Sequence, residues 1–498
     1  MIHDLDTPLF QVADGKGMSP WTIRNAVEGT AIFGGIGSGK TSGSGCTIAR
    51  KLLEKNFGGL VLTAKPDEKD MWVRYCQEAG RLDDLIIVEP GGQHAFNFLE
   101  YESAQRHGGI SLTENIVQVL KTVIAAGVEK SNGKSDDPFW EDALNMLIFN
   151  SIDLSLLAYG KVSVQDLYDI VVTAPKKEPR PEDKGKPTAF KVAFAAARDR
   201  VDAQVEQFLK TLTPEEQSRL HRDAALFEAT ILEKIPDART LQFVDQFFVE
   251  SYRNLSEKTR SIIEFSFSGF LFRLLKEPVH SLFCRRPSTL SPDDCRKGKI
   301  VLLNFPVKQY YKVGRDIQVM MKFIFQRAWE SRSLREDDHY VFLWADEAQH
   351  FLHEHDQEFS ATARSAGIAT VYLSQNLPNY HANMGGGAKS EYRVKGFLGT
   401  LSTKIFHANA DIETNSYASD LIGQGYVEDK SRTVGMAGQY QSSQGTSIKL
   451  EKLVRPEEFV GLCTGGPQNG KRVSCFIHRQ GNKFHNGFNF IEAFFPQD

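Results

Sequence analysis

A loop near residue 40 combines closely spaced glycines with one lysine and small hydroxyl side chains. The stretch AIFGGIGSGKTSGSG occupies residues 31–45 and runs from an apolar strand into a helix. Eight consecutive residues in it fit the pattern GxxxxGK[ST]: Gly34, Gly35, Ile36, Gly37, Ser38, Gly39, Lys40 and Thr41. Glycines allow backbone N–H groups to surround phosphate oxygens, and the helix that follows adds its positive dipole end. We therefore predict that this loop, with the adjoining Ser42, binds a nucleoside triphosphate, with Lys40 at the β- and γ-phosphates and Thr41 as a ligand of Mg²⁺.

A pair of adjacent carboxylates follows a second apolar run, YVFLWADEAQ, at residues 340–349. Binding a triphosphate does not hydrolyse it, because hydrolysis also requires a held Mg²⁺ and a base for the attacking water. We predict that Asp346 supports the metal through bound water and that Glu347 orients and deprotonates the attacking water. A solvated acidic turn is the alternative for an isolated Asp-Glu pair, and the phosphate loop upstream favours the catalytic interpretation.

Two polar residues beyond the carboxylates are further candidates. Gln375 ends the apolar run ATVYLSQ, and the carboxyl end of a parallel strand faces the crevice where ligands bind in such sheets. We predict that Gln375 contacts the γ-phosphate or its water, with a structural capping role as the alternative. Arg364 lies on a segment predicted as a helix, residues 355–368, and could stabilise charge in the transition state. Its position alone favours a solvated surface group.

Seven short runs that are apolar almost throughout provide the strands for these residues. They occupy residues 59–63, 85–90, 299–305, 340–347, 369–375, 403–408 and 472–478. Unbroken apolar strands are buried on both faces, which is typical of parallel sheets covered by helices. Because helical periods separate most of these runs, we predict an α/β, doubly wound domain with a mostly parallel central sheet.

Helical periods replace strands in the middle of the chain. The clearest predicted helices are residues 114–128, 139–159, 189–212 and 257–278. We therefore predict an all-helical domain, residues 105–298, inserted between two parts of the α/β domain, residues 1–104 and 299–498. Within the insertion, the Pro- and charge-rich residues 173–188 are predicted to form a mobile loop. The polar residues 433–447 are predicted to form a second flexible stretch.

Composition and charge limit the partners of this chain. With 498 residues, a net charge of −4 and a pI near 6.4, it lacks the overall basic character of histone-like nucleic-acid binders. Any contact with nucleic acid must therefore be local. The six cysteines are scattered without a CxxC pair, which favours a reducing cytoplasm. The most apolar stretch, residues 261–275, contains Glu264 and Arg273 and is shorter than the ~20 residues of a spanning helix.

The motifs in their order resemble a known family. The segments that carry the resemblance are GTAIFGGIGSGKTSGSG, VLTAKPDE, HAFNFLEY, DPFWEDAL, VLLNFP, VFLWADEAQHF, ATARSAGIATVYLSQNL and GFLGTLSTKIFHANADIETNSYASDLIGQ. Together they are similar to the VirD4/TraG/TraD coupling ATPases of conjugation and type IV secretion, which belong to the FtsK/HerA branch of RecA-like ring motors. The resemblance spans nearly the whole chain. It implies a RecA-like P-loop NTPase fold with an inserted helical domain.

The resemblance also implies an activity and a set of partners. Such a protein forms a hexameric ring that hydrolyses ATP at subunit boundaries and moves DNA, or a protein–DNA substrate, through a central channel. Its partners are secretion-channel or relaxase-type proteins. By this likeness the phosphate loop binds ATP, and Asp346 and Glu347 are the magnesium and catalytic carboxylates. Gln375 is the sensing glutamine, and Arg364 matches an arginine placed in trans, which favours a role for it beyond the surface.

One departure from the family keeps other functions open. Family members usually begin with transmembrane helices, whereas nothing of that kind precedes Gly34 in this sequence. We therefore expect a cytoplasmic protein that reaches the membrane only through a partner. The alternatives are a nucleotide-gated docking receptor, which captures protein substrates through its helical insertion, and a soluble HerA-like motor for DNA processing or defence.

Overall fold

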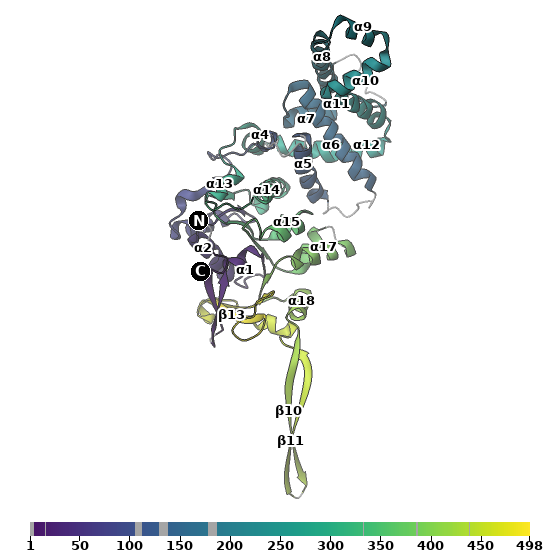
Figure 1. The fold of residues 1–498 in the computed structure, drawn as a ribbon. Coiled ribbons are helices and arrows are strands. Elements are labelled where there is room, and N and C mark those ends of the chain that lie inside the picture. The colour runs from purple at the N-terminus through teal and green to yellow at the C-terminus, as the bar shows by residue number, and fades with distance from the viewer. Residues whose placement is uncertain are drawn as a thin grey trace. The chain divides into compact units, whose positions relative to one another are not determined.

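The computed structural model describes residues 4–14, 16–104, 112–128, 138–177, 187–331, 333–384, 387–437 and 439–498. The chain divides into two compact units, which are coloured by residue number in Figure 1. One unit contains Met1–Ile87 and Pro292–Asp498 and is called the sheet unit, and the other contains Val88–Ser291 and is called the helical unit. These bounds differ from the insertion predicted for residues 105–298, because helix α4 (Phe98–Ala104) packs against helix α5 (Leu112–Val128).

In the described residues, the sheet unit is built on a central sheet of nine strands. Its strands lie in the order β13-β12-β9-β3-β8-β7-β4-β6-β5. Their bounds are β3 Thr30–Phe33, β4 Gly58–Leu62, β5 Leu85–Val88, β6 Ile300–Leu303, β7 Val341–Ala345, β8 Ile368–Ser374, β9 Thr403–His407, β12 Arg472–Arg479 and β13 Phe490–Pro496. The pairings from β9 across to β6 are parallel, and β12 and β13 add an antiparallel edge. The predicted α/β fold with a mostly parallel sheet is therefore confirmed, as are the seven predicted strands.

The central strands are apolar because helices bury both of their faces. Every residue of β3, β4, β7 and β8 is buried. Helices α2 (Cys46–Glu54) and α3 (Glu68–Glu78) share one core cluster with the sheet, in which the Trp72 ring stacks on Phe342 with centroids 5.6 Å apart. Burial of such side chains contributes about 25 cal/mol for each Å² removed from water.

The register of the sheet aligns the carboxyl ends of its central strands. Phe33, the last residue of β3, lies opposite Ser374 at the end of β8. Ala345, the last residue of β7, lies opposite Leu62 at the end of β4 and opposite Tyr372 near the end of β8. The segments that follow these four strands therefore leave the sheet at the same edge.

A fully buried ion pair holds the segment that follows β7. Lys322, in helix α14 (Val307–Glu330), lies 2.6 Å from both carboxylate oxygens of Asp356, and neither side chain is exposed. The same ammonium group donates to the carbonyl oxygen of Phe351 at 2.8 Å. The Lys322 ammonium group thus holds both the segment that follows β7 and the start of helix α15 (Asp356–Thr362).

The sheet unit contains further elements outside this sheet. They are strands β1 (Pro8–Ala13) and β2 (Met18–Thr22), helices α1 (Ile23–Val27), α13 (Pro292–Arg296), α16 (Leu377–Asn383), α17 (Gly387–Gly399) and α18 (Ile412–Ile422), and strands β10 (Gln424–Ala437) and β11 (Gln439–Lys452). Strands β10 and β11 form an antiparallel hairpin in register from Gln424↔Lys452 to Ala437↔Gln439. No strand was predicted at residues 433–447, but residues 433–437 and 439–447 pair as strands, because backbone pairing satisfies a polar sequence as readily as an apolar one. The flexibility of this stretch stays a prediction.

The helical unit contains the four predicted helices. They are α5, α6 (Pro138–Tyr159), α8 (Ala189–Lys210) and α12 (Glu257–Leu274). Further helices are α7 (Val164–Val172), α9 (Pro214–Arg222), α10 (Ala224–Lys234) and α11 (Pro236–Asp245), with π-helical turns at Gln246–Tyr252 and His280–Arg285. Of the predicted mobile loop at residues 173–188, residues 178–186 lie outside the described part of the chain.

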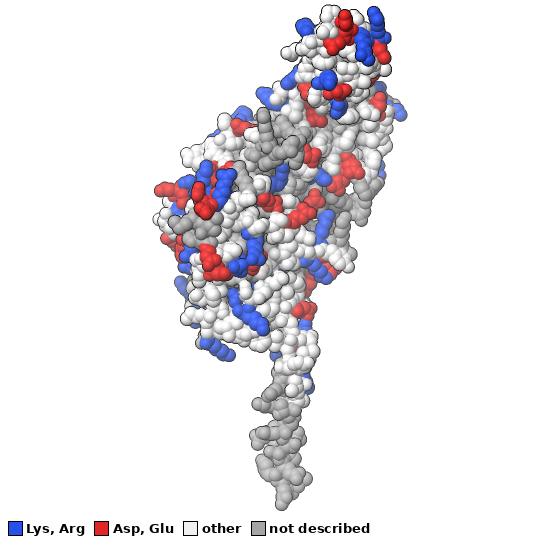
Figure 2. Space-filling model, viewed as in Figure 1, with Lys and Arg blue, Asp and Glu red and all other residues white. Residues whose placement is uncertain are grey.

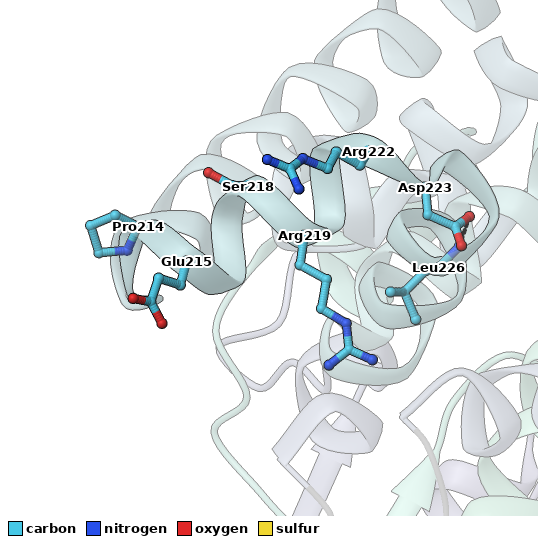
Figure 3. Close-up of a pocket in the computed structure, with 7 residues that line it drawn as sticks. All are labelled: Pro214, Glu215, Ser218, Arg219, Arg222, Asp223 and Leu226. Atoms are coloured by element: carbon cyan, nitrogen blue, oxygen red, sulfur yellow. Dashed lines mark hydrogen bonds between the residues drawn. The ribbon is translucent and has the colours of Figure 1, made fainter.

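A pocket of about 680 Å³ lies on helices α9 and α10 of the helical unit. Figure 3 shows its lining, which combines two arginines with polar and acidic side chains: Pro214, Glu215, Ser218, Arg219, Arg222, Asp223 and Leu226. On the face drawn in Figure 2, positive and negative side chains of the described residues are interspersed, and no continuous basic field is seen on that face. Among the described helices, none taken singly has the length and hydropathy of a membrane span, and one pair, residues 139–159 with 164–172, meets both criteria jointly across a bend of 115°.

Candidate active site

The glycine-rich loop follows β3 and is tied to both neighbouring strands. Gly34 N donates to Ser374 O at 3.3 Å, and Gly35 N donates to Ala408 O at 2.9 Å. Gly37 and Gly39 have φ values of +71° and +80°, which residues other than glycine adopt only with strain. The loop is therefore anchored at its start and depends on glycine at its turn.

The segment TSGSG after the lysine is a single π-helical turn, Thr41–Gly45, that leads into α2. Gly45 N donates to Lys40 O at 2.9 Å, five residues back. A Cβ atom at Gly45 would lie 2.8 Å from that same carbonyl oxygen, and one at Gly43 would overlap the Val473 side chain. Close packing against backbone and against β12 thus explains glycines that are otherwise poor helix formers.

The two ends of the predicted site meet at the carboxyl edge of the sheet. Thr41 Oγ1 donates to Asp346 Oδ2 at 3.1 Å, although 305 positions separate the two residues. Asp346 and Glu347 follow β7 and are 1% and 4% exposed. Glu347 adopts left-handed backbone angles, φ 50° and ψ 48°, and its N–H donates to Asp346 Oδ1 at 2.8 Å. This strained turn directs two adjacent carboxylates into one site, and backbone strain of this kind is common where a side chain must be aimed.

Two amide side chains hold the Glu347 carboxylate. Gln349 Nε2 donates to Glu347 Oε2 at 2.8 Å, and Gln375 Nε2 donates to Glu347 Oε1 at 3.1 Å. Burial by itself would raise the pKa of Glu347, but these two hydrogen bonds and the charges of Lys40 and Lys65 lower it below its usual value. The carboxylate is therefore ionised at neutral pH, as a general base must be.

Four residues that complete the site were not predicted from the sequence. Lys65, which follows β4, places Nζ 3.4 Å from Asp346 Oδ2 and 3.5 Å from Glu347 Oε1. Gln349 holds Glu347, and Ser374 Oγ donates to Gln349 Oε1 at 2.9 Å. Glu68 is buried, and burial together with the charge of Asp346 raises its pKa well above the usual value. A lysine just after the apolar run GLVLT was a usable signal, since a neighbouring parallel strand ends at the same edge.

Arg364 does not join this cluster. Helix α15 ends at Thr362, so the prediction of a helix across residues 355–368 was wrong in its second half. Gly367, with φ +66°, closes a turn in which Ile368 N donates to Ala363 O at 2.9 Å. Arg364 therefore precedes β8, whereas Gln375 follows it, and the rise of a strand separates the two by roughly 20 Å. The Arg364 guanidinium is half exposed and pairs with Glu28 Oε1 at 3.2 Å.

The donor atoms at this edge fit magnesium and a triphosphate. Mg²⁺ prefers oxygen ligands, keeps several waters, and is usually held by one or two protein oxygens together with phosphates. Thr41 Oγ1 and Asp346 Oδ2 are such oxygens and lie side by side. Lys40 is buried next to them, and in the described part of the chain no group of three or more His, Cys, Asp or Glu residues could form a metal site from protein alone. This donor set matches metal delivered with a nucleotide.

The chain is similar to known proteins in one sequence segment and in its fold. The model of a family described as "TraM recognition site of TraD and TraG" matches residues 340–462, which include β7 and β8 and both carboxylates. No curated protein sequence matches the chain. The structure is similar to that of the bacterial conjugative coupling protein TrwBdeltaN70 in an unbound form, with a TM-score of 0.61 and 14% identity over 98% of this chain and 88% of that one.

Two nucleotide complexes of the plasmid coupling protein TrwB are similar as well. The complex with the ATP analogue ADPNP has a TM-score of 0.60 and 13% identity, and the complex with ADP and Mg²⁺ has a TM-score of 0.53 and 12% identity. Each match covers 96% of this chain and 87% of the other. At these identities the likeness establishes the fold. The resemblance to the VirD4/TraG/TraD coupling ATPases is thus confirmed at the level of the fold: the chain has the fold of the conjugative coupling protein TrwB, and residues 340–462 match the model of the TraD and TraG family.

Proposed function

We propose that this chain is an ATP-hydrolysing motor of the coupling-protein type, which passes DNA or a protein–DNA substrate to a type IV secretion channel. The observation that carries the proposal is the meeting of Thr41, Asp346, Glu347 and Gln375 at one edge of the sheet. A phosphate loop alone is compatible with many nucleotide-binding proteins. A phosphate loop beside an ionised, amide-oriented carboxylate is the arrangement that hydrolysis requires.

In the proposed mechanism each residue acts from the position described above. The loop amides and Lys40 bind the phosphates, and Thr41 and Asp346 hold Mg²⁺, which when bound neutralises charge on the phosphates. Glu347 accepts a proton from the attacking water at its carboxylate. Gln375 holds the carboxylate and would orient the water that this carboxylate receives. Water ordering of this kind makes the attack effectively intramolecular.

The place of Arg364 supports an oligomeric assembly. An arginine at the edge of the sheet opposite the phosphate loop does not reach its own site, so a role in hydrolysis requires a neighbouring subunit. A ring of subunits in head-to-tail contact, with six copies as the resemblance implies, brings Arg364 to the next subunit's nucleotide. We further propose that DNA lies in the channel of this ring, that the partners are relaxase-type and secretion-channel proteins, and that the protein is cytoplasmic and reaches the inner membrane through a partner.

The proposal is tested by measuring ATP hydrolysis with and without single- and double-stranded DNA. Wild-type protein should hydrolyse ATP faster with DNA, Lys40→Ala should neither bind nor hydrolyse it, and Glu347→Gln should bind ATP but hydrolyse it at least about a hundredfold more slowly. Glu54→Gln on α2, which removes an exposed carboxylate paired with Lys51, is the matched control and should be fully active. A rate that is the same with and without DNA would contradict the motor function.

A further inference from the structure

Lys65 is a cation at the active site that none of the steps above uses. It follows the strand β4, and Nζ lies 3.4 Å from Asp346 Oδ2 and 3.5 Å from Glu347 Oε1. Its side chain is 27% exposed, whereas the two carboxylates are 2% and 5% exposed. Burial lowers the pKa of Lys65, but the charges of the two carboxylates outweigh burial and the pKa is raised. The side chain is thus a permanent cation with room to move.

The oxygen that Lys65 contacts is the oxygen that magnesium needs. Asp346 Oδ2 accepts a hydrogen bond from Thr41 Oγ1 at 3.1 Å and lies 3.4 Å from the ammonium group. A Mg²⁺ ion held by Thr41 and Asp346 would therefore share the Asp346 carboxylate with the ammonium. Two cations on one carboxylate repel strongly in a site of low dielectric constant. An ammonium group and a metal ion at the same Asp346 carboxylate therefore weaken each other's binding.

We propose that Lys65 is a positioning residue that competes with divalent metal for Asp346 and Glu347, so that metal enters only together with a nucleotide. This inference rests on the proposed function and concerns the regulation of the same site. A triphosphate attracts the ammonium away from the carboxylates, because its charge is larger and a lysine side chain has a flexible four-carbon stem. Metal alone offers the ammonium no such alternative partner.

The test is a titration of the protein with Mn²⁺ in the absence of nucleotide. Electron paramagnetic resonance measures the concentration of free Mn²⁺ at each step. Lys65→Met removes the charge and keeps the length of the side chain, so its dissociation constant for Mn²⁺ should be at least about tenfold lower than that of wild type. Lys65→Arg keeps the charge and should bind Mn²⁺ as weakly as wild type. Lys51→Met, which removes a lysine paired with Glu54 on α2, should leave Mn²⁺ binding unchanged.

The double variant Lys65→Met/Asp346→Asn locates the effect. It should lose the gain in Mn²⁺ affinity, because the metal then lacks the carboxylate that Lys65 had occupied. Loss of structure weakens metal binding, so a gain cannot arise from misfolding. Equal or weaker Mn²⁺ binding by Lys65→Met would overturn the proposal, as would an equal gain in Lys51→Met.

The outcome of the Mn²⁺ titration is independent of the outcome of the ATPase test. Mn²⁺ binding requires neither nucleotide nor hydrolysis, so a protein that does not hydrolyse ATP still reports on Lys65. If wild type is inactive with ATP and Lys65→Met gains Mn²⁺ affinity, the proposed hydrolysis is wrong and the competition stands. If wild type is an active ATPase and Lys65→Met shows no gain, the competition alone is wrong.

Discussion

Gly45 should not tolerate a single added methyl group, although alanine is ordinarily the better helix residue. Replacing a helical glycine with alanine usually stabilises a protein by about 0.5–1 kcal/mol. At Gly45 the new Cβ would lie 2.8 Å from Lys40 O and 3.2 Å from Leu373 Cδ2. The first neighbour is backbone, so the carbonyl of the phosphate-binding lysine must shift. Overpacking of this kind costs about 1–3 kcal/mol, which leaves a net destabilisation of about 1 kcal/mol.

The larger effect of Gly45→Ala should be on nucleotide affinity. A shift of the Lys40 backbone moves the ammonium group and the amides of the loop together, so we expect a fluorescent ATP analogue to bind at least about tenfold more weakly. Gly269→Ala in α12 is the matched control, because it is a helical glycine with no atom within 4 Å of an added Cβ. It should bind the analogue normally and unfold at the same or a higher denaturant concentration by circular dichroism.

The result that would refute this reasoning is simple to recognise. If Gly45→Ala binds the analogue with wild-type affinity and gains as much stability as Gly269→Ala, the close approach between Gly45 and Lys40 does not exist in solution. The explanation given for the glycines of TSGSG would then be wrong.

The remaining predictions concern Arg364 and a buried histidine. Arg364→Ala should change the free energy of unfolding by less than about 1 kcal/mol, since the Arg364 side chain in its ion pair with Glu28 is half exposed. Mixing this variant with inactive Lys40→Ala should restore part of the ATPase rate, and no restoration would exclude action in trans. Burial lowers the pKa of His353 to about 3, from the usual 6.5 of a histidine. Between pH 6.5 and 3 the unfolded chain therefore binds the extra proton, and this histidine destabilises the fold on acidification. Wild type should therefore lose about 2 kcal/mol relative to His353→Leu between pH 6.5 and 5 in denaturant titrations, and identical pH slopes would contradict the burial of this imidazole.

The strands and the phosphate loop could be predicted because their signals are local. Continuous apolar runs such as YVFLWA indicate strands buried on both faces, and GxxxxGK[ST] indicates a turn of defined backbone shape. The placement of Gln375 beside Glu347 was also within reach, because parallel strands end at a common edge. Strands β1, β2 and β13 were not predicted, since their pairing partners rather than their own periodicity determine them.

By itself, the sequence determined that this chain folds around a mostly parallel sheet, and it predicted that residues 34–41 bind phosphate and that the carboxylates at 346 and 347 serve hydrolysis. Those properties follow from residue type and short-range spacing. Only the tertiary structure decided that Lys65 shares an oxygen with Thr41, that Gly45 packs on the Lys40 carbonyl, and that Arg364 lies at the far edge from the nucleotide. Strand order and helix ends set these relations, and both depend on contacts between residues far apart in the chain, which no local pattern encodes.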